Sequence, residues 1–237
     1  MLRERGDYDR ALGLYHEALA LRREVGDTIW IAWALADLGD VASAQARHAQ
    51  ARTWLTESHA LFRQLDDASG LSLTLRELGD VARDAGDQDA ARAHYEESLR
   101  ISKDRGWVWG IAAAFARLGL LAQHQGDDAA RVTLLANALN LIRPLDAIQA
   151  IVLILLEFAD LAVTHRHAER ATQLLGAVDG LLGAAHEGMA MANRDVYDRV
   201  RSAVGAQLDE TRLAIMREEG RAMTLEQAVA YALEDSR

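Results

Sequence analysis

The sequence contains no cysteine and a single proline, Pro144, among its 237 residues. Without cysteine the chain has no disulfide framework, no thiolate nucleophile and no cysteine-ligated zinc or iron–sulfur site. Scarce proline and scattered glycine suit long helices and provide no flexible or low-complexity linker. The composition therefore favours an all-helical protein, and the lack of cysteine fits the cytoplasmic location that we expect.

Positive charge and long apolar runs are also scarce. The 26 Lys and Arg residues stand against 36 Asp and Glu, for a net charge of −10, which repels phosphate backbones and anionic lipid. The most apolar run, residues 150–156, ends at Glu157, far short of the roughly 20 residues that span a bilayer. The charged N-terminus lacks the apolar stretch of a secretory signal. We expect no direct nucleic-acid contact by this segment and no membrane anchor.

Sequence motifs for catalysis and cofactor binding are missing as well. The chain has no His-Glu-x-x-His, no Gly-x-Ser-x-Gly, no Gly-rich dinucleotide loop and no phosphate-binding loop. Of the eight histidines, His165 and His167 stand two apart in a turn, which is the wrong spacing for one helix face, and Glu169 is their only nearby carboxylate. The sequence thus predicts a protein that is not an enzyme and has no metal or cofactor site.

Short segments recur at a strict interval of 40 residues. Residues 38–42, 78–82, 118–122 and 158–162 read LGDVA, LGDVA, LGLLA and FADLA. Gly-Asp pairs at 6–7, 86–87 and 126–127, with degenerate copies at 46–47 and 166–167, mark the turns between paired helices. Such a period indicates a repeat architecture, in which each unit is one helical hairpin.

Small and large residues alternate at helical spacing within each unit. The columns are Ala11, Ala51, Ala91 and Ala171; then Tyr15, Leu55, Tyr95, Leu135 and Leu175; then Ala18, Ser58, Ser98, Ala138 and Val178; and, in the first helix, Leu35, Leu75, Phe115 and Leu155. A small residue lets two helices approach closely, and the large residue beside it fills the remaining space. Both helices of each pair therefore carry a core stripe.

These columns and the mid-helix Leu-Gly pair resemble tetratricopeptide repeats over roughly residues 1–185. The resemblance implies an all-α, right-handed superhelix of antiparallel helix pairs. Two features depart from the family: the period is 40 instead of about 34, and Leu or Phe replaces the usual tryptophan of the first helix. Long-period variants of this kind resemble those of bacterial signal-transduction ATPases and kinesin light chains.

The period divides the chain into three parts. Residues 1–26 supply the second helix of an incomplete first repeat, 27–185 form four helix pairs, and 186–237 form a C-terminal helical cap. In the cap, we expect Asn193 and Asp209 to begin helices and Thr224 with Gln227 to form a capping box. Because the first repeat is incomplete, we expect the chain to be part of a longer protein; the alternative is that a partner covers its open N-terminal face.

The amino-acid sequence of the C-terminal part carries a second resemblance. Residues 171–177, 195–198 and 219–233 are similar to the C-terminus of large bacterial regulators. Those regulators join a LuxR-type DNA-binding domain or a class III adenylate cyclase to a switching ATPase and a repeat domain. The resemblance implies a sensor module whose nucleotide switch lies outside this chain.

In the resembling repeats, the first helix of each pair lines the concave groove. The 40-residue register places these candidate groove residues there: Trp33, Asp37, Asp40, Arg76, Asp80, Arg83, Arg117 and Gln123. The three arginines could clamp a carboxylate or phosphate, or pair along the helix with Glu77, Asp80 and Asp84. Trp33 is either a groove contact or a packing residue.

Two functions follow from these expectations. The first is a sensor domain of a bacterial signalling or transcriptional regulator, binding a protein, a peptide or a small effector in the groove. The second is a free-standing adaptor that bridges proteins or forms a dimer through its N-terminal face.

Overall fold

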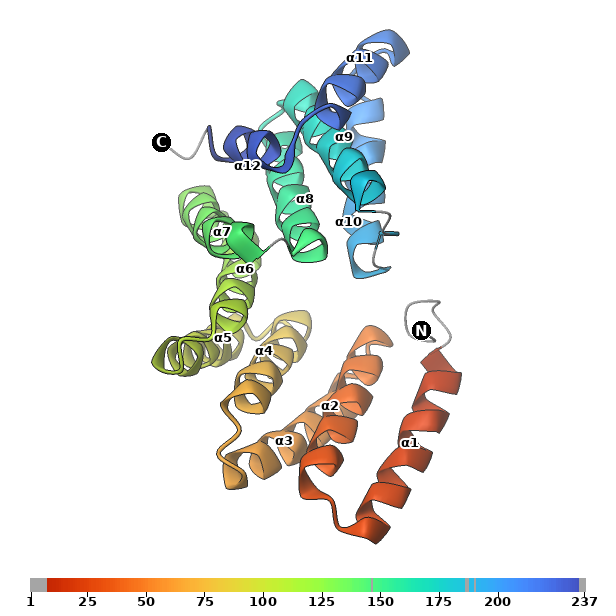
Figure 1. Ribbon diagram of the computed structural model, residues 1–237, viewed down its shortest axis with the longest axis vertical. Helices are drawn as coiled ribbons and strands as arrows, with labels where there is room; N and C mark the ends of the chain where they lie inside the picture. Colours follow the sequence, from red (N-terminus) through yellow and green to blue (C-terminus); the bar gives the residue numbers. More distant parts are fainter. Residues whose placement is uncertain (1–7, 146, 186–187, 190, 235–237) are drawn as a thin grey trace. The chain divides into compact units, whose positions relative to one another are not determined.

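The computed structural model describes residues 8–145, 147–185, 188–189 and 191–234, and all their regular structure is helical. The chain divides into two compact units, Met1–Gln125 and Gly126–Arg237. The first unit holds α1 (Tyr8–Val25), α2 (Thr28–Ala44), α3 (His48–Gln64), α4 (Ala68–Asp84), α5 (Gln88–Asp104) and α6 (Val108–His124). In Figure 1 these helices run from red to green, and α2/α3 and α4/α5 form antiparallel hairpins.

The second unit holds α7 (Asp128–Ile142), a short 3-10 turn (Arg143–Leu145), α8 (Ile148–Thr164), α9 (Ala168–Ala184), α10 (Met191–Gly205), α11 (Glu210–Arg221) and α12 (Leu225–Leu233). Helices α8 and α9 form a further hairpin, against which α10, α11 and α12 pack. The predicted all-helical fold built from successive helix pairs is confirmed. The division between the compact units falls inside the segment 27–185, and the three-part organisation stays a prediction.

The turns explain why the period is so regular. Helices α2 to α6 each have 17 residues, and positive φ angles recur every 20 residues from residue 26 to residue 126 and again at residue 166. They occur at Gly26, Ala46, Asp66, Gly86, Gly106, Gly126 and Arg166. A left-handed residue ends a helix, and glycine adopts that conformation without steric cost. The predicted Gly-Asp turns and their degenerate copies are confirmed where the structure describes them; the Gly6-Asp7 pair lies outside the described residues.

The aspartate after the left-handed residue begins the next helix. The side chains of Asp67, Asp87 and Asp127 each accept a hydrogen bond from a backbone N–H three residues on, at 3.0 Å. This is the ordinary N-cap interaction, which satisfies one of the free donors at a helix start. Gly, or the residue that replaces it, followed by Asp therefore ends one helix and begins the next.

The alternating columns form the core. The described small residues Ala51, Ala91 and Ala171 and the large residues Leu55, Tyr95, Leu135 and Leu175 are fully buried. Gly39 and Gly79 let Leu55 and Tyr95 pack directly on the backbone, because a Cβ at either glycine would overlap those side chains. The serines of the small column are also satisfied: Ser58 and Ser98 donate to the carbonyl oxygens of Ala32 and Ser72 at 2.7 and 2.9 Å.

Two of the three C-terminal helices begin where the sequence indicates, whereas α10 begins at Met191, so Asn193 lies inside this helix and the prediction that it caps the helix is wrong. Asp209 caps α11 by accepting from the N–H of Arg212 at 2.9 Å, and Thr224 with Gln227 forms the predicted capping box of α12. The side chain of Asn193 lies outside the described residues. Helices α9 and α11 cross with their backbones in contact, since a Cβ at Gly176 or Gly220 would overlap the main chain of the other helix.

Candidate functional site

One stripe of α2, α4 and α6 stays half-exposed while the residues beside it are buried. We call this stripe the first-helix face; it comprises Trp33, Asp37, Asp40 and Ser43 of α2, Leu73, Glu77, Asp80 and Arg83 of α4, and Ala113, Arg117, Leu120 and Gln123 of α6. The members recur at helical spacing, so each helix presents one line of side chains. All candidate groove residues except Arg76 belong to this face.

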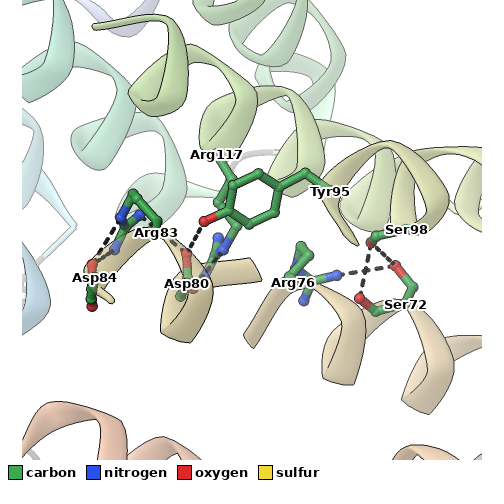
Figure 2. A network of polar contacts seen from close by, with 8 residues as sticks. All are labelled: Ser72, Arg76, Asp80, Arg83, Asp84, Tyr95, Ser98 and Arg117. Carbon is green, nitrogen blue, oxygen red and sulfur yellow. Dashed lines mark hydrogen bonds and ion pairs between the residues drawn. The ribbon is translucent and has the colours of Figure 1, made fainter. Parts of the chain in front are cut away.

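Asp80 is the centre of a polar network on α4 (Figure 2). Its Oδ1 accepts from the hydroxyl of Tyr95 at 2.8 Å and from Nη1 of Arg83 at 3.2 Å. Its Oδ2 accepts from Nε of Arg117 at 2.9 Å. The network joins α4 to its partner α5 and to the next first helix, α6. Burial and the nearby Asp80 carboxylate raise the pKa of Tyr95, so its hydroxyl stays protonated and donating.

Arg83 and Arg117 are thus engaged within the protein. Arg83 also binds Asp84 through Nε and Nη2, at 2.9 and 2.8 Å. The pairing of these arginines with acids, one of the two interpretations of the sequence, is present in the structure. Arg117 links α6 to α4, whereas both acids bound by Arg83 lie on its own helix, α4.

Arg76 lies apart from this pair. Its side chain is buried, and its Nη1 donates to Oγ of Ser72 at 3.2 Å (Figure 2). The hydroxyl of Ser72 also contacts the hydroxyls of Ser98 and Ser102. The guanidinium carbon lies 5.8 Å from the ring centre of Trp107. Burial, followed by the repulsion of Arg117, lowers the pKa of Arg76 to about 10. Arg76 therefore donates to Ser72, whereas Arg83 and Arg117 both bind Asp80.

Glu77 stands at the position of α4 that corresponds to Arg117 of α6. Its Oε2 is buried and has no hydrogen-bond partner among the described residues. Burial, followed by repulsion from Asp40 of α2, raises the pKa of Glu77 well above the usual range of a glutamate. With Asp37 and Asp40, Glu77 makes the α2 side of the first-helix face acidic.

The tryptophans take different roles. The ring of Trp33 packs edge-on against Phe62, with centres 4.9 Å apart, and the residue is partly buried. Both interpretations of Trp33 therefore stay open, because one edge packs and another reaches solvent. Trp54 packs against the core clusters of α1 to α4. Trp30 and Trp109 are about half exposed, at 50% and 44%.

In the second unit, two acids at the equivalent positions of the first-helix face are buried. On α8, Glu157 and Asp160 are buried, and Nη2 of Arg131 binds their carboxylates at 2.9 and 3.1 Å. Arg199 of α10 adds a bond to Asp160 at 3.1 Å. This cluster was not predicted, although the sequence carries a signal for it: Arg131 occupies the column that holds Ala51, Ala91 and Ala171. A fully buried arginine in a small-residue column requires acidic partners.

The described residues contain no group of three or more His, Asp or Glu side chains placed to hold a metal ion. His165 and His167 have ring centres 6.2 Å apart, and His165 contacts Asp128 at 2.7 Å. Within the described part of the chain, no helix is both long and apolar enough to cross a membrane.

Comparison with known proteins agrees with this geometry. The family model described as tetratricopeptide repeat matches residues 1–64 and 45–104. The N-terminal part is of tetratricopeptide type. Tetratricopeptide repeats generally mediate contacts between proteins and generally act as non-catalytic scaffolds.

Structural comparison extends the likeness beyond the matched repeats. The crystal structure of BtubC (BKLC) from P. vanneervenii superposes with a TM-score of 0.60 at 15% identity, over 84% of this chain and 92% of that one. At 15% identity this similarity shows a shared fold alone. No curated protein matches the sequence.

Proposed function

We propose that this chain is a protein-binding module whose first-helix face holds a peptide or a segment of a partner protein. The observation that carries the proposal is the first-helix face itself, a half-exposed line of aromatic, acidic and basic side chains kept in register over α2, α4 and α6. Repeat proteins generally use such extended surfaces for binding. Trp33 supplies an aromatic anchor and the acids supply charge selection.

The test compares two variants that make the same change of charge. Asp37→Lys alters the first-helix face, whereas Glu96→Lys alters an exposed position on α5. Partners recovered with the wild-type chain from its own cell extract, and then purified, should bind Asp37→Lys at least about tenfold more weakly. Glu96→Lys should retain wild-type affinity. Equal partner affinities for the wild type, Asp37→Lys and Glu96→Lys, measured by calorimetry, would reject the first-helix face as the binding site.

The broader context that we propose is a cytoplasmic sensor module of a bacterial signalling or transcriptional regulator. It rests on the resemblance of residues 171–177, 195–198 and 219–233 to the C-terminus of regulators with a LuxR-type domain or an adenylate cyclase. The gene sequence on the 5′ side of the Met1 codon tests this: a phosphate-binding-loop ATPase there supports it, and an unrelated reading frame contradicts it. A small effector in place of a peptide would appear as binding without a protein partner.

Self-association is the second candidate, and one observation favours it. Helix α1 exposes Leu14, Leu21 and Val25 at 50%, 63% and 80%, an apolar line on its outer side. Tyr15, by contrast, packs against the core of α1 and α2. A dimer through this N-terminal face should therefore dissociate in the Leu21→Glu variant without loss of helicity. Light scattering distinguishes the dimer from the monomer. A wild-type chain that is monomeric at high concentration excludes the dimer.

A further inference from the structure

Helix α4 carries polar residues at positions that are apolar in the other first helices. Ser72, Thr74 and Arg76 of α4 are buried. In the 40-residue register they correspond to Ala32, Ala34 and Ala36 of α2, to Ala112, Ala114 and Ala116 of α6, and to Val152, Ile154 and Leu156 of α8. Burying a polar side chain costs stability unless hydrogen bonds compensate it. The surroundings of α4 therefore differ in chemistry from those of the other first helices.

The same kind of change occurs on α3, which packs against α4. His59 of α3 stands where α1, α5 and α7 have Leu19, Leu99 and Leu139. Its Nδ1 lies 3.0 Å from Oγ1 of Thr74, and the Thr74 hydroxyl donates to the carbonyl oxygen of Gly70 at 2.8 Å. Because that hydroxyl hydrogen is already used, Nδ1 of His59 is the donor, and its Nε2 takes no part in the bond.

Two adjoining pockets lie beside these residues. The first, of about 360 Å³, is lined by residues of α3, α4 and α5, among them His59, Arg63, Leu71, Leu75, Glu97 and Ile101. The second, of about 230 Å³, shares Ala68, Ile101 and Arg105 with the first and also includes Trp107. We call the two pockets together the α3–α5 groove. Its size is that of a small-molecule site, which typically measures roughly 300–1,000 Å³.

The second pocket is the apolar part of the groove. Its walls are almost entirely apolar, and Ile101 and Trp107 are only partly buried. Ser102 also lines it, and its hydroxyl lies 2.7 Å from that of Ser72. A cavity of about 150 Å³ with apolar walls accommodates a benzene molecule. The second pocket therefore has room for an aromatic ring or a branched alkyl group.

Arg63 is the available cation of the groove. The other arginines of the groove are paired with its acids: Arg100 with Glu97 and Asp104, at 2.7 and 2.8 Å, and Arg105 with Asp66, at 3.0 Å. Arg63 forms no hydrogen bond or ion pair with any residue that the structure describes. Its guanidinium group can therefore bind a carboxylate through two parallel hydrogen bonds. Since the net charge of −10 repels anions at long range, such binding depends on this short contact.

We propose that the α3–α5 groove is a second binding site, for a small organic anion in which a carboxylate is joined to an aromatic or branched apolar group. The carboxylate binds Arg63, and the apolar group occupies the pocket between Ile101 and Trp107. Helices α3 and α5 contribute nothing to the first-helix face, so this inference is independent of the proposed peptide binding.

Phenylbutyrate is a suitable probe, and the neutral phenylbutyramide is its matched control. In NMR titrations of the full chain, phenylbutyrate should shift the indole N–H signal of Trp107, which the Trp107→Phe variant assigns. The amide should bind at least about fivefold more weakly, because it lacks the charge that Arg63 recognises. Arg63→Gln should remove this difference between the two compounds. Arg52→Gln, an exposed position of α3 that does not line the groove, should preserve it.

Ala68→Leu tests the apolar part of the site. Ala68 lines both pockets, so the larger side chain should fill the groove and weaken both compounds at least about tenfold. Circular dichroism should show unchanged helicity. A Trp107 signal that phenylbutyrate does not shift, or equal affinities of the wild type for the acid and the amide, would overturn the inference. Tighter binding of the tripeptide Gly-Gly-Phe than of phenylbutyrate would assign the groove to a peptide C-terminus and overturn the small ligand.

Discussion

At the scale of single residues, the same register position carries different chemistry in different repeats. Asp40, Asp80 and Asp160 are equivalent in sequence, yet Asp80 accepts from Arg117 and Asp160 from Arg131 and Arg199. Asp40 lies near Glu77, whose pKa is raised by burial and then by repulsion from Asp40. A residue column thus indicates where a side chain lies, and its neighbours decide its charge and its role.

Glu77 should make the stability of the protein depend on pH. Its pKa is higher in the folded chain than in the unfolded chain, through burial and Asp40, so the folded state holds the proton more tightly. The protonated Glu77 side chain therefore contributes its full share of stability below the unfolded pKa. This contribution is lost as the pH rises from the unfolded pKa through the folded pKa. Glu77→Gln should unfold at higher urea concentration than the wild type at pH 8, and this difference should shrink towards pH 4. A difference that grows on acidification would contradict the raised pKa.

Arg131 should be one of the most sensitive positions of the second unit. It is fully buried and binds Glu157 and Asp160, so Arg131→Ala leaves a buried carboxylate without its cation. We expect the free energy of unfolding to fall by about 3–5 kcal/mol. Adding Glu157→Gln should restore part of this loss, because a neutral amide needs no counter-charge. Urea denaturation of the single and double variants measures this coupling.

At the scale of helices, contact distance is set by glycines. Gly79 receives the ring of Tyr95 between α4 and α5, whereas Gly176 and Gly220 bring the backbones of α9 and α11 together. Glycine inside a helix costs roughly 0.5–1 kcal/mol relative to alanine, so these positions are explained by packing. The described glycines with open space around them, such as Gly183 of α9, lack that reason.

Gly220→Ala and Gly183→Ala should have opposite effects. A Cβ at Gly220 overlaps the carbonyl group of Gln173 on α9 and forces α11 away, while a Cβ at Gly183 meets nothing. Gly220→Ala should therefore lower the melting temperature of the second unit and increase hydrogen exchange in α11. Gly183→Ala should leave the melting temperature of the second unit unchanged or raise it slightly. Equal effects of the two substitutions would show that the α9–α11 contact does not limit stability.

At the scale of the whole molecule, the net charge of −10 agrees with a basic partner. Opposite charges accelerate encounter, and salt screens them over a distance of about 10 Å at 0.1 M. Association of a basic peptide with the chain should slow markedly between 50 and 300 mM salt, while dissociation changes less. Stopped-flow fluorescence of Trp33, with Trp33→Phe as the control for the other tryptophans, measures both rates. A salt-independent association rate would argue against an electrostatic partner.

The sequence alone determined the helix pairs, the turns and the core columns of this protein. Each of these depends on local chemistry: a left-handed residue ends a helix, an aspartate begins the next one, and an alternation of small and large residues at helical spacing produces a buried face. The register also placed Trp33, Asp37, Asp40, Asp80, Arg83, Arg117 and Gln123 on one half-exposed face.

Only the tertiary structure decided how the charged residues of that face are paired. It turned Arg76 inward to Ser72, joined Arg83 and Arg117 at Asp80, left Glu77 beside Asp40, and buried Arg131 between two acids. Long side chains reach across helices, and the neighbour that each one meets depends on the distance and angle between helices. Sequence spacing along one helix does not contain that information.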